Sequence, residues 1–170
     1  MASDEMFMAR ALEIAAAGVT SGEMPIGAVV VVDGRVVSEA HTQEVGQRRL
    51  LVHAELLALD AADRELGLRG GGASLYATLE PCLMCLGAAF TIRVAEVVYA
   101  LESPSDGGHH AFVEWDRERQ SSSMPGYALP VVRGGVLRQR SATLFRSYAD
   151  GAPAGWARNW AAELGSLADD

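Results

Sequence analysis

Cysteine is scarce in this sequence: only two occur in 170 residues, and they lie three positions apart at Cys82 and Cys85. One closely spaced pair cannot supply the framework of a disulfide-stabilised secreted domain, so that class is excluded. Two cysteines at this spacing still allow a single disulfide, a redox pair or half of a metal site. Composition does not choose among these three, so the choice depends on the surrounding residues.

Long hydrophobic runs are also missing, since the apolar stretches are too short to span a bilayer. The segment Ala11–Val19 is apolar like the core of a signal peptide, but Asp4 and Glu5 precede it where a signal would carry positive charge. Arg10 interrupts the apolar character further. These features predict a soluble, cytoplasmic protein without a membrane partner.

Basic residues are outnumbered, with 14 Lys and Arg against 22 Asp and Glu and a formal net charge of −8. A protein that binds a phosphate backbone usually carries a basic patch. Basic clusters occur at Arg48–Arg49 and between Arg133 and Arg140, but the overall balance and the acidic Asp169–Asp170 oppose a large polyanionic partner. Nucleic acid is therefore an unfavoured partner, although it is not excluded.

The remaining sequence is 49% hydrophobic, enough to bury a core as one domain over residues 1–170. Its periodicity predicts strands and helices in alternation after an opening hairpin. Residues 103–130 are rich in Gly, Ser and Pro and predict mainly loop. The fold class predicted is α/β: a three-layer α/β/α domain with a mixed central sheet of about five strands. The expected helices cover residues 4–17, 53–66, 81–93, 141–149 and 153–164, and the expected strands 26–32, 35–40, 75–79, 94–101 and 131–137.

Two short segments indicate chemistry: His53-Ala54-Glu55, and Pro81-Cys82-Leu83-Met84-Cys85. Catalytic zinc needs three protein ligands and one open position for water, and one imidazole with two thiolates meets that count. Cys82 and Cys85 are spaced i, i+3, so they point from one helical face and can bind the same ion. The first turn of the expected helix also favours thiolate over thiol. We therefore expect one Zn²⁺ per subunit, held by His53, Cys82 and Cys85.

Glu55 is the candidate proton carrier. Zinc lowers the pKa of bound water towards neutrality, so zinc-bound hydroxide can attack a carbon that bears an amino group. The reaction also needs a group that takes the water proton, protonates the ring nitrogen and then protonates departing ammonia. A carboxylate beside the metal that does not bind it can perform all three transfers, and Glu55 lies two residues after His53.

Simpler interpretations of these motifs explain less. A structural zinc site would need a fourth protein ligand, and neither His41, His109 nor His110 has ligand-like spacing to the cysteines. A redox pair would explain neither Glu55 nor the proline before Cys82. The two motifs in this order form the His-x-Glu and Pro-Cys-x-x-Cys pattern of zinc deaminases, which favours a catalytic site.

With these motifs, the sequence resembles the cytidine deaminase-like superfamily, and within it the branch of bacterial tRNA adenosine deaminases and guanine deaminases. The resemblance covers roughly residues 5 to 148. It implies a homodimer and a base held beside the metal against Ile26 and Leu79, with the backbone of Ala54 and Glu80 orienting the ring. Ordinary strand packing is the alternative interpretation of Ile26 and Leu79. The matching residues are Met24-Pro25-Ile26-Gly27-Ala28-Val29, His53-Ala54-Glu55 and residues 75–85.

The sequence departs from this branch where substrate is held. Thr42 falls where these enzymes usually carry an asparagine, and one hydroxyl replaces an amide donor and acceptor pair. Gln43 or Glu44 could substitute for the asparagine, or be solvated. In residues 47–52, which are basic and then apolar, Arg48 or Arg49 could meet an anionic substrate group, or solvent.

The C-terminal third differs as well. Residues 150–170 form a divergent helical extension, because Gly151 and Pro153 break the basic helix with which tRNA enzymes tend to end. In the loop over residues 103–130, His110 and Trp115 could stack on and cap a small ring, or pack locally.

Together these features predict a zinc-dependent hydrolytic deaminase of a small nitrogen heterocycle, a purine or related base or nucleoside. One alternative is a tRNA adenosine deaminase that makes inosine. Another is a non-catalytic, zinc-stabilised binding module, which would not need Glu55.

Overall fold

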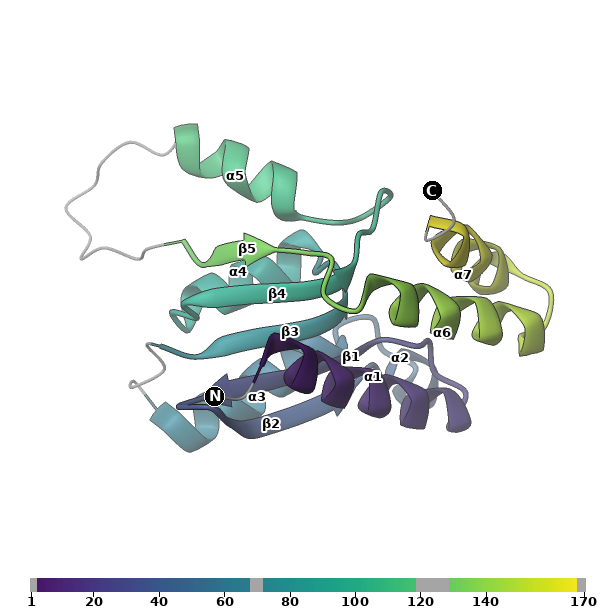
Figure 1. Cartoon of the computed structure of the whole chain (residues 1–170), viewed down its shortest axis with the longest axis horizontal. Helices are drawn as coiled ribbons and strands as arrows, with labels where there is room; N and C mark the ends of the chain where they lie inside the picture. The colour runs from purple at the N-terminus through teal and green to yellow at the C-terminus, as the bar shows by residue number, and fades with distance from the viewer. Residues whose placement is uncertain (1–2, 68–71, 119–128, 168–170) are drawn as a thin grey trace.

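The computed structural model of the chain describes residues 3–67, 72–118 and 129–167, and its central feature is a five-stranded sheet in the order β2-β1-β3-β4-β5. Helices cover both faces of this sheet (Figure 1). The strands are β1 (Gly27–Val32), β2 (Arg35–His41), β3 (Ser74–Leu79), β4 (Glu96–Leu101) and β5 (Val131–Arg133). The helices are α1 (Asp4–Thr20), α2 (Glu44–Gln47), α3 (Ala54–Leu66), α4 (Leu83–Thr91), α5 (His109–Glu118), α6 (Arg138–Gly151) and α7 (Trp156–Ser166).

The sheet is mixed, as the sequence predicted. Strand β1 runs antiparallel to β2 and to β3, whereas β3, β4 and β5 are parallel. The hairpin between β1 and β2 turns at Asp33 and Gly34, whose φ angles of 50° and 74° are those of a tight turn that matches the twist of the strands. Helix α3 precedes β3 and α4 connects β3 to β4, and both helices lie on one face of the sheet (Figure 1).

Strand β1 shows why both faces need cover. Ala28 and Val30 are fully buried in the cluster that includes Leu59 and Leu86 of α3 and α4. The alternate residues Val29 and Val31 belong to a second cluster with α1. Successive strand side chains point to opposite faces, so a strand that is apolar throughout has to be buried on both. This burial on both faces confirms the three-layer α/β/α architecture.

The strand register gathers three chain segments at one edge of the sheet. Gly27 at the start of β1 pairs with His41 at the end of β2. Because β1 is antiparallel to β3, that same edge receives the end of β3 at Leu79. Helices α3 and α4 also begin there, and this edge carries the candidate site.

The prediction that residues 103–130 are mainly loop holds for residues 103–108 but was wrong for residues 109–118. Residues 109–118 form helix α5, while residues 119–128 lie outside the described part of the chain. Phe112 anchors this helix: it is 6% exposed and packs edge to face on Phe90, with ring centroids 6.0 Å apart. Burial of one aromatic side chain therefore outweighs the surrounding polar composition.

Several predicted boundaries also shift. Strand β5 ends at Arg133 rather than residue 137, because Gly134 lies against the ring of Tyr99 and Gly135 has a φ of 94°. Helix α6 consequently starts at residue 138 instead of 141, β4 starts at 96 instead of 94, and α4 spans 83–91 rather than 81–93. The short helix α2 was not predicted.

The chain ends in a pair of packed helices. Helix α7 folds back along α6, and Phe145, Ala161 and Leu164 are buried between them and the end of the sheet (Figure 1). None of the helices in the described residues combines the length and apolar character needed to cross a membrane.

Candidate active site

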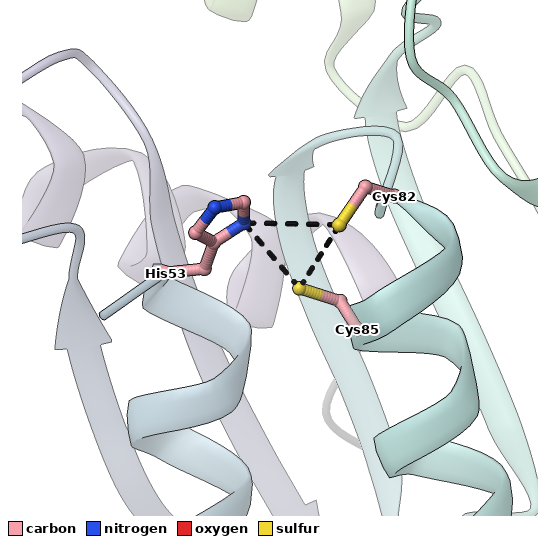
Figure 2. A group of neighbouring side chains, drawn as sticks. All are labelled: His53, Cys82 and Cys85. Atoms are coloured by element: carbon pink, nitrogen blue, oxygen red, sulfur yellow. Dashed lines mark hydrogen bonds between the residues drawn. The ribbon is translucent and has the colours of Figure 1, made fainter. Parts of the chain in front are cut away.

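Three potential metal ligands converge at the edge of the sheet where α3 and α4 begin (Figure 2). Nδ1 of His53 lies 3.8 Å from Sγ of Cys82 and 3.6 Å from Sγ of Cys85. The two sulfur atoms are 3.6 Å apart. The structure thus brings together the three residues that the sequence singled out as zinc ligands.

Two helix starts position these side chains. His53 occupies the N-cap position of α3, and Cys82 occupies the N-cap position of α4, one turn before Cys85. The unpaired N–H groups at a helix start carry partial positive charge, which favours thiolate at Cys82 and Cys85. The local fold therefore prepares the two sulfur ligands for a cation.

The spacing of the donor atoms fits zinc. With Zn–S distances of about 2.3 Å and Zn–N distances of about 2.0–2.1 Å, a tetrahedral ion separates two sulfurs by about 3.8 Å and sulfur from nitrogen by about 3.6 Å. The observed separations lie between 3.6 and 3.8 Å. Two soft thiolates with one imidazole are also the donor set that zinc prefers. Three protein ligands leave the fourth position open to water and substrate.

The protein environment shifts the pKa values of the three ligands in different directions. Hydrogen bonding to Cys85 and to His53 lowers the pKa of Cys82 to about 4. The same hydrogen bonds raise the pKa of the partner groups. The pKa of His53 rises to about 9, chiefly through Cys82, and the pKa of Cys85 also rises. Zinc binds thiolate and neutral imidazole, so binding has to release protons from Cys85 and His53.

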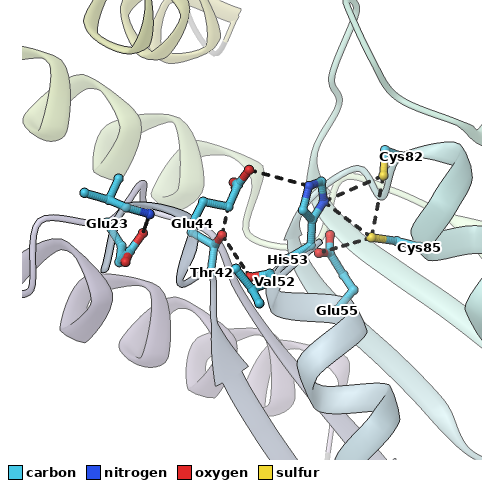
Figure 3. A network of polar contacts seen from close by, with 9 residues as sticks. Glu23, Thr42, Glu44, Val52, His53, Glu55, Cys82 and Cys85 are labelled. Atoms are coloured by element: carbon cyan, nitrogen blue, oxygen red, sulfur yellow. Dashed lines mark hydrogen bonds and ion pairs between the residues drawn. The ribbon is translucent and has the colours of Figure 1, made fainter. Parts of the chain in front are cut away.

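Glu55 lies directly beside the ligands. It is 3% exposed, and its Oε2 accepts a hydrogen bond from Sγ of Cys85 at 3.6 Å (Figure 3). Burial raises the pKa of this carboxyl to about 7. The structure therefore places an acid that can both hold and release a proton next to the metal ligands.

A second carboxylate orients the imidazole of His53. Nε2 of the ring faces Oε1 of Glu44 at 3.8 Å, while Nδ1 faces the sulfurs (Figure 3). Glu44 is held in turn by Thr42, whose Oγ1 donates to it at 3.2 Å. A carboxylate on the far side of a metal-binding imidazole fixes the ring and strengthens it as a ligand. The sequence indicated no such role for Glu44, because the contact depends on how the loop before α3 folds.

Thr42 takes part in the hydrogen-bond network around His53. It is 1% exposed, and its hydroxyl lies between Glu44 and the carbonyl oxygen of Val52, at 3.2 and 3.3 Å. A buried Glu23 supports the same loop, since its carboxylate accepts the backbone N–H groups of Val45 and Gly46. The position where the resemblance led us to expect an asparagine thus belongs to the network that orients His53.

A cavity of about 440 Å³ opens over the ligands, which is large enough for a purine nucleoside. Five residues predicted to contact substrate line it: Ile26, Thr42, Ala54, Leu79 and Glu80. The carboxylate of Glu80 is occupied elsewhere, since it accepts the N–H groups of Ser103 and His109. Gly107 packs so closely on this carboxylate that a Cβ atom would lie 2.4 Å from it.

Two predicted contacts lie away from the cavity, and two unpredicted residues line it. His110 and Trp115 are on α5 and are not among the lining residues; Trp115 stacks on Phe112 with centroids 5.8 Å apart. Trp156 and Trp160 of α7 form part of the wall instead. Their i, i+4 spacing is visible in the sequence, but the chain reversal between α6 and α7 that brings them to the cavity is not.

A three-layer fold with a His-Cys-Cys donor set and an adjacent buried glutamate defines a zinc-dependent hydrolase class. The model of the cytidine and deoxycytidylate deaminase zinc-binding region matches residues 1–101. The chain belongs to this deaminase family, and zinc is its cofactor.

Sequence relatives include tRNA-modifying proteins. The tRNA-specific adenosine deaminase of Bacillus subtilis is 43% identical over 108 residues, which cover 63% of this chain and 67% of that protein. The tRNA(Ile)-lysidine synthase of Thermus thermophilus is 39% identical over 146 residues, which cover 85% of this chain. The chain spans 25% of the length of the synthase.

Solved structures give the same fold with two kinds of substrate. One, from work on A-to-I editing by tRNA:A34 deaminases at the wobble position of transfer RNA, has a TM-score of 0.70 and 33% identity, covering 81% of this chain and 97% of that chain. The guanine deaminase from Nitrosomonas europaea has a TM-score of 0.69 and 26% identity, covering 87% and 85%.

Proposed function

We propose that this chain is a hydrolytic deaminase whose substrate is an adenosine in tRNA, which it converts to inosine with release of ammonia. The observation that carries the chemistry is the buried carboxylate of Glu55, 3.6 Å from Cys85 among the metal ligands. The relatives named tRNA-specific adenosine deaminase support the substrate, with 43% identity in the Bacillus subtilis protein. Net charge favours a small free heterocycle, but it is a property of the whole surface rather than of the site.

The residues of the chain divide the work. His53, Cys82 and Cys85 would hold zinc, which supplies an activated water nucleophile when bound. Glu55 takes one proton of the attacking water and passes it to the ring nitrogen as the oxygen bonds to the carbon. It then takes the second proton, from the hydroxyl on that carbon, and gives it to the departing amine as the C–N bond breaks. One water is consumed and one ammonia released, so the carboxylate is restored. Ile26 and Leu79 hold the flat faces of the base against the cavity wall.

Two exposed arginines are compatible with a polynucleotide substrate, although the net charge of the chain is −8. Arg48 and Arg49 are exposed and lie in the segment between Glu44 and His53, both of which line the cavity. Exposed guanidinium groups in this segment can contact the phosphates on either side of a base that enters the cavity.

A free purine base or nucleoside is the second candidate substrate. Four acidic residues line the cavity, and among the described residues the lining contains neither lysine nor arginine. Such a wall receives an uncharged ring but offers no partner to a phosphate, so it favours an unphosphorylated substrate. The likeness to a guanine deaminase structure points the same way. The four acidic residues are Glu44, Glu55, Glu80 and Asp106.

The deciding experiment measures ammonia release by zinc-loaded protein on an anticodon stem-loop with a wobble adenosine, and on free purines, pyrimidines and their nucleosides. Turnover of the stem-loop with inosine formation is the expected result. Turnover confined to a free purine would establish the second candidate, and no turnover of either class would overturn both.

Glu55→Ala provides the test of mechanism in the same assay. We expect it to retain zinc and to lose at least about a hundredfold in rate, the usual contribution of a positioned acid–base group. Glu13→Ala, an exposed change on α1, serves as the control. Full activity in Glu55→Ala would eliminate its role as proton carrier.

A further inference from the structure

Two indole rings form one side of the cavity, and both come from α7. Trp156 is the first residue of this helix, and Trp160 follows one turn later. Residues four apart on a helix project from the same face, so the two rings share a surface. That surface lines the same cavity as His53 and Glu55. The wall lies outside both metal-binding motifs and takes no part in the proton transfers assigned to Glu55.

Trp160 is fixed within this wall. Its ring packs edge to face on Phe145, with centroids 6.2 Å apart and an interplanar angle of 86°. Its Nε1–H donates to Oγ of Ser105 at 2.9 Å. These contacts hold both ends of the indole, so Trp160 gives the cavity a rigid side rather than an adjustable one.

Trp156 differs sharply from its neighbour. It is 78% exposed although it lines the cavity, and it is among the most exposed large hydrophobic residues of the described chain. An indole left in water forgoes the burial that a large aromatic ring normally gains. The ring is thus available to a flat ligand that enters the cavity.

The helix that carries Trp156 is firmly placed. Arg146 donates to the carbonyl oxygen of Gly165 at 2.7 Å, and Arg138 donates to that of Leu167 at 2.5 Å. Leu164 is 2% exposed and packs in the cluster with Phe145. These contacts hold the C-terminal end of α7, and Trp160, one turn after Trp156, is held by Phe145 and Ser105. The backbone that carries Trp156 is therefore placed before the substrate arrives.

We propose that Trp156 is a stacking platform for an aromatic heterocycle at the mouth of the cavity, and so a positioning residue for the substrate. The inference rests on the proposed deaminase function of the same site. The stacked ring is either the base that is deaminated or the base next to it in an RNA strand. Stacking of a base on an aromatic side chain contributes about 1–3 kcal/mol by alanine substitution, which corresponds to roughly a 5- to 150-fold change in affinity.

The test is a binding measurement on zinc-loaded protein that carries Glu55→Ala to prevent turnover. Isothermal titration calorimetry measures the affinity for the anticodon stem-loop and, separately, for free adenosine and guanine, and the quenching of intrinsic tryptophan fluorescence is recorded in parallel. Trp156→Ala should weaken binding by roughly 5- to 150-fold. Trp156→Phe should restore most of the affinity, because a phenyl ring also stacks, while abolishing the quenching that the indole reports. Trp115→Phe is the matched control, since Trp115 is also exposed, at 45%, but does not line the cavity.

The possible outcomes distinguish the platform from the deaminase itself. Weaker binding of the stem-loop alone assigns the platform to the neighbouring base, and weaker binding of the free compounds assigns it to the reacting ring. Equal affinity in Trp156→Ala and its parent overturns the platform while leaving the deaminase intact. Failure of the parent to bind any probe overturns the proposed substrates themselves. In the active protein, Trp156→Ala should raise KM and leave kcat nearly unchanged.

Discussion

At the scale of single residues, the imidazole of His53 is positioned from both sides. The cysteine sulfurs face its Nδ1, and Glu44 faces its Nε2. Thr42 keeps Glu44 in place through its hydroxyl. The ring is therefore oriented before any cation arrives, and less conformational freedom has to be lost on binding.

This arrangement predicts that Glu44→Ala lowers zinc affinity about ten- to a hundredfold without removing a ligand. The ring would lose the carboxylate that fixes its orientation. Competition with a chromogenic chelator measures the affinity, and Glu13→Ala provides an exposed glutamate for comparison. Unchanged affinity in Glu44→Ala would show that the contact with His53 is incidental.

The residues that sequence reasoning could find are those whose signal is local. His53, Glu55, Cys82 and Cys85 lie in two short motifs whose spacing alone specifies a donor set and a carboxylate. The cavity is also lined by Glu44, Trp156 and Trp160, whose positions depend on how distant loops and helices pack. No short-range sequence pattern predicts those positions. The substrate side of the site was accordingly the less predictable one.

At the scale of elements, prediction succeeded where one face of a segment is uniformly apolar. The strands β1 and β3 are recognisable as short continuous apolar runs, and the helix α3 by buried residues that recur at helical spacing. Helix α5 is not, because it is anchored by Phe112, which packs on Phe90 of the neighbouring helix α4. Helix α2 depends likewise on Glu23, which is over twenty positions away in the chain and accepts its N–H groups.

The pairing of α6 with the sheet gives a prediction about pH. Arg138 holds the pKa of Glu102 below its usual value. A depressed carboxyl pKa stabilises the fold above the pKa of the unfolded chain, about 4.3, and this stabilisation is lost as the pH falls through the folded pKa. Glu102→Gln should therefore lower the free energy of unfolding at pH 7 by no more than about 1 kcal/mol for so exposed a pair, with a matching fall in Tm. The difference should become progressively smaller below pH about 4.

Thermal unfolding at intervals from pH 7 downward would measure this difference for Glu102→Gln. The matched control is Glu13→Gln, whose partner Arg10 is exposed and has a second carboxylate, Glu39, as a neighbour. A deficit that stays constant as the pH falls would contradict a charge-dependent role for Glu102.

At the scale of the whole molecule, the metal ligands come from the starts of two helices that are separated in the chain by strand β3. The ligands begin α3 and α4, which lie side by side on one face of the sheet. An ion bound there stabilises the native chain by mass action. At free zinc a hundred times its Kd this amounts to about 2.7 kcal/mol, or roughly 5–11 °C in Tm for a chain of this size.

Removing zinc with a strong chelator should therefore lower Tm by that amount, and added zinc should restore it. Cys85→Ser loses a ligand, so its Tm should respond far less to either treatment. Calorimetry or circular dichroism follows the transition. A native protein whose Tm ignores the chelator would show that the ion contributes nothing to the fold.

The charge distribution yields a prediction about RNA. All 14 basic residues are arginine and the net charge is −8, so binding to a polyanion has to be local. Each phosphate of single-stranded RNA that the protein no longer neutralises reduces the slope of log K against log salt by about 0.7. Arg48→Ala with Arg49→Ala should flatten this slope for the stem-loop and leave turnover of a free nucleoside unchanged. A slope that does not change would place the RNA elsewhere on the surface.

The reacting residues and the entrance of the cavity are carried by different elements of the fold. Glu55 and the metal ligands lie at the starts of α3 and α4. The two indole rings that line the cavity come from α7, which follows β5 and α6 in the chain. Replacement of that terminal helix would change the entrance and leave the reacting centre untouched. In a fold organised in this way, changes in α7 can alter which aminated ring the cavity accepts, while the residues that break the C–N bond stay the same.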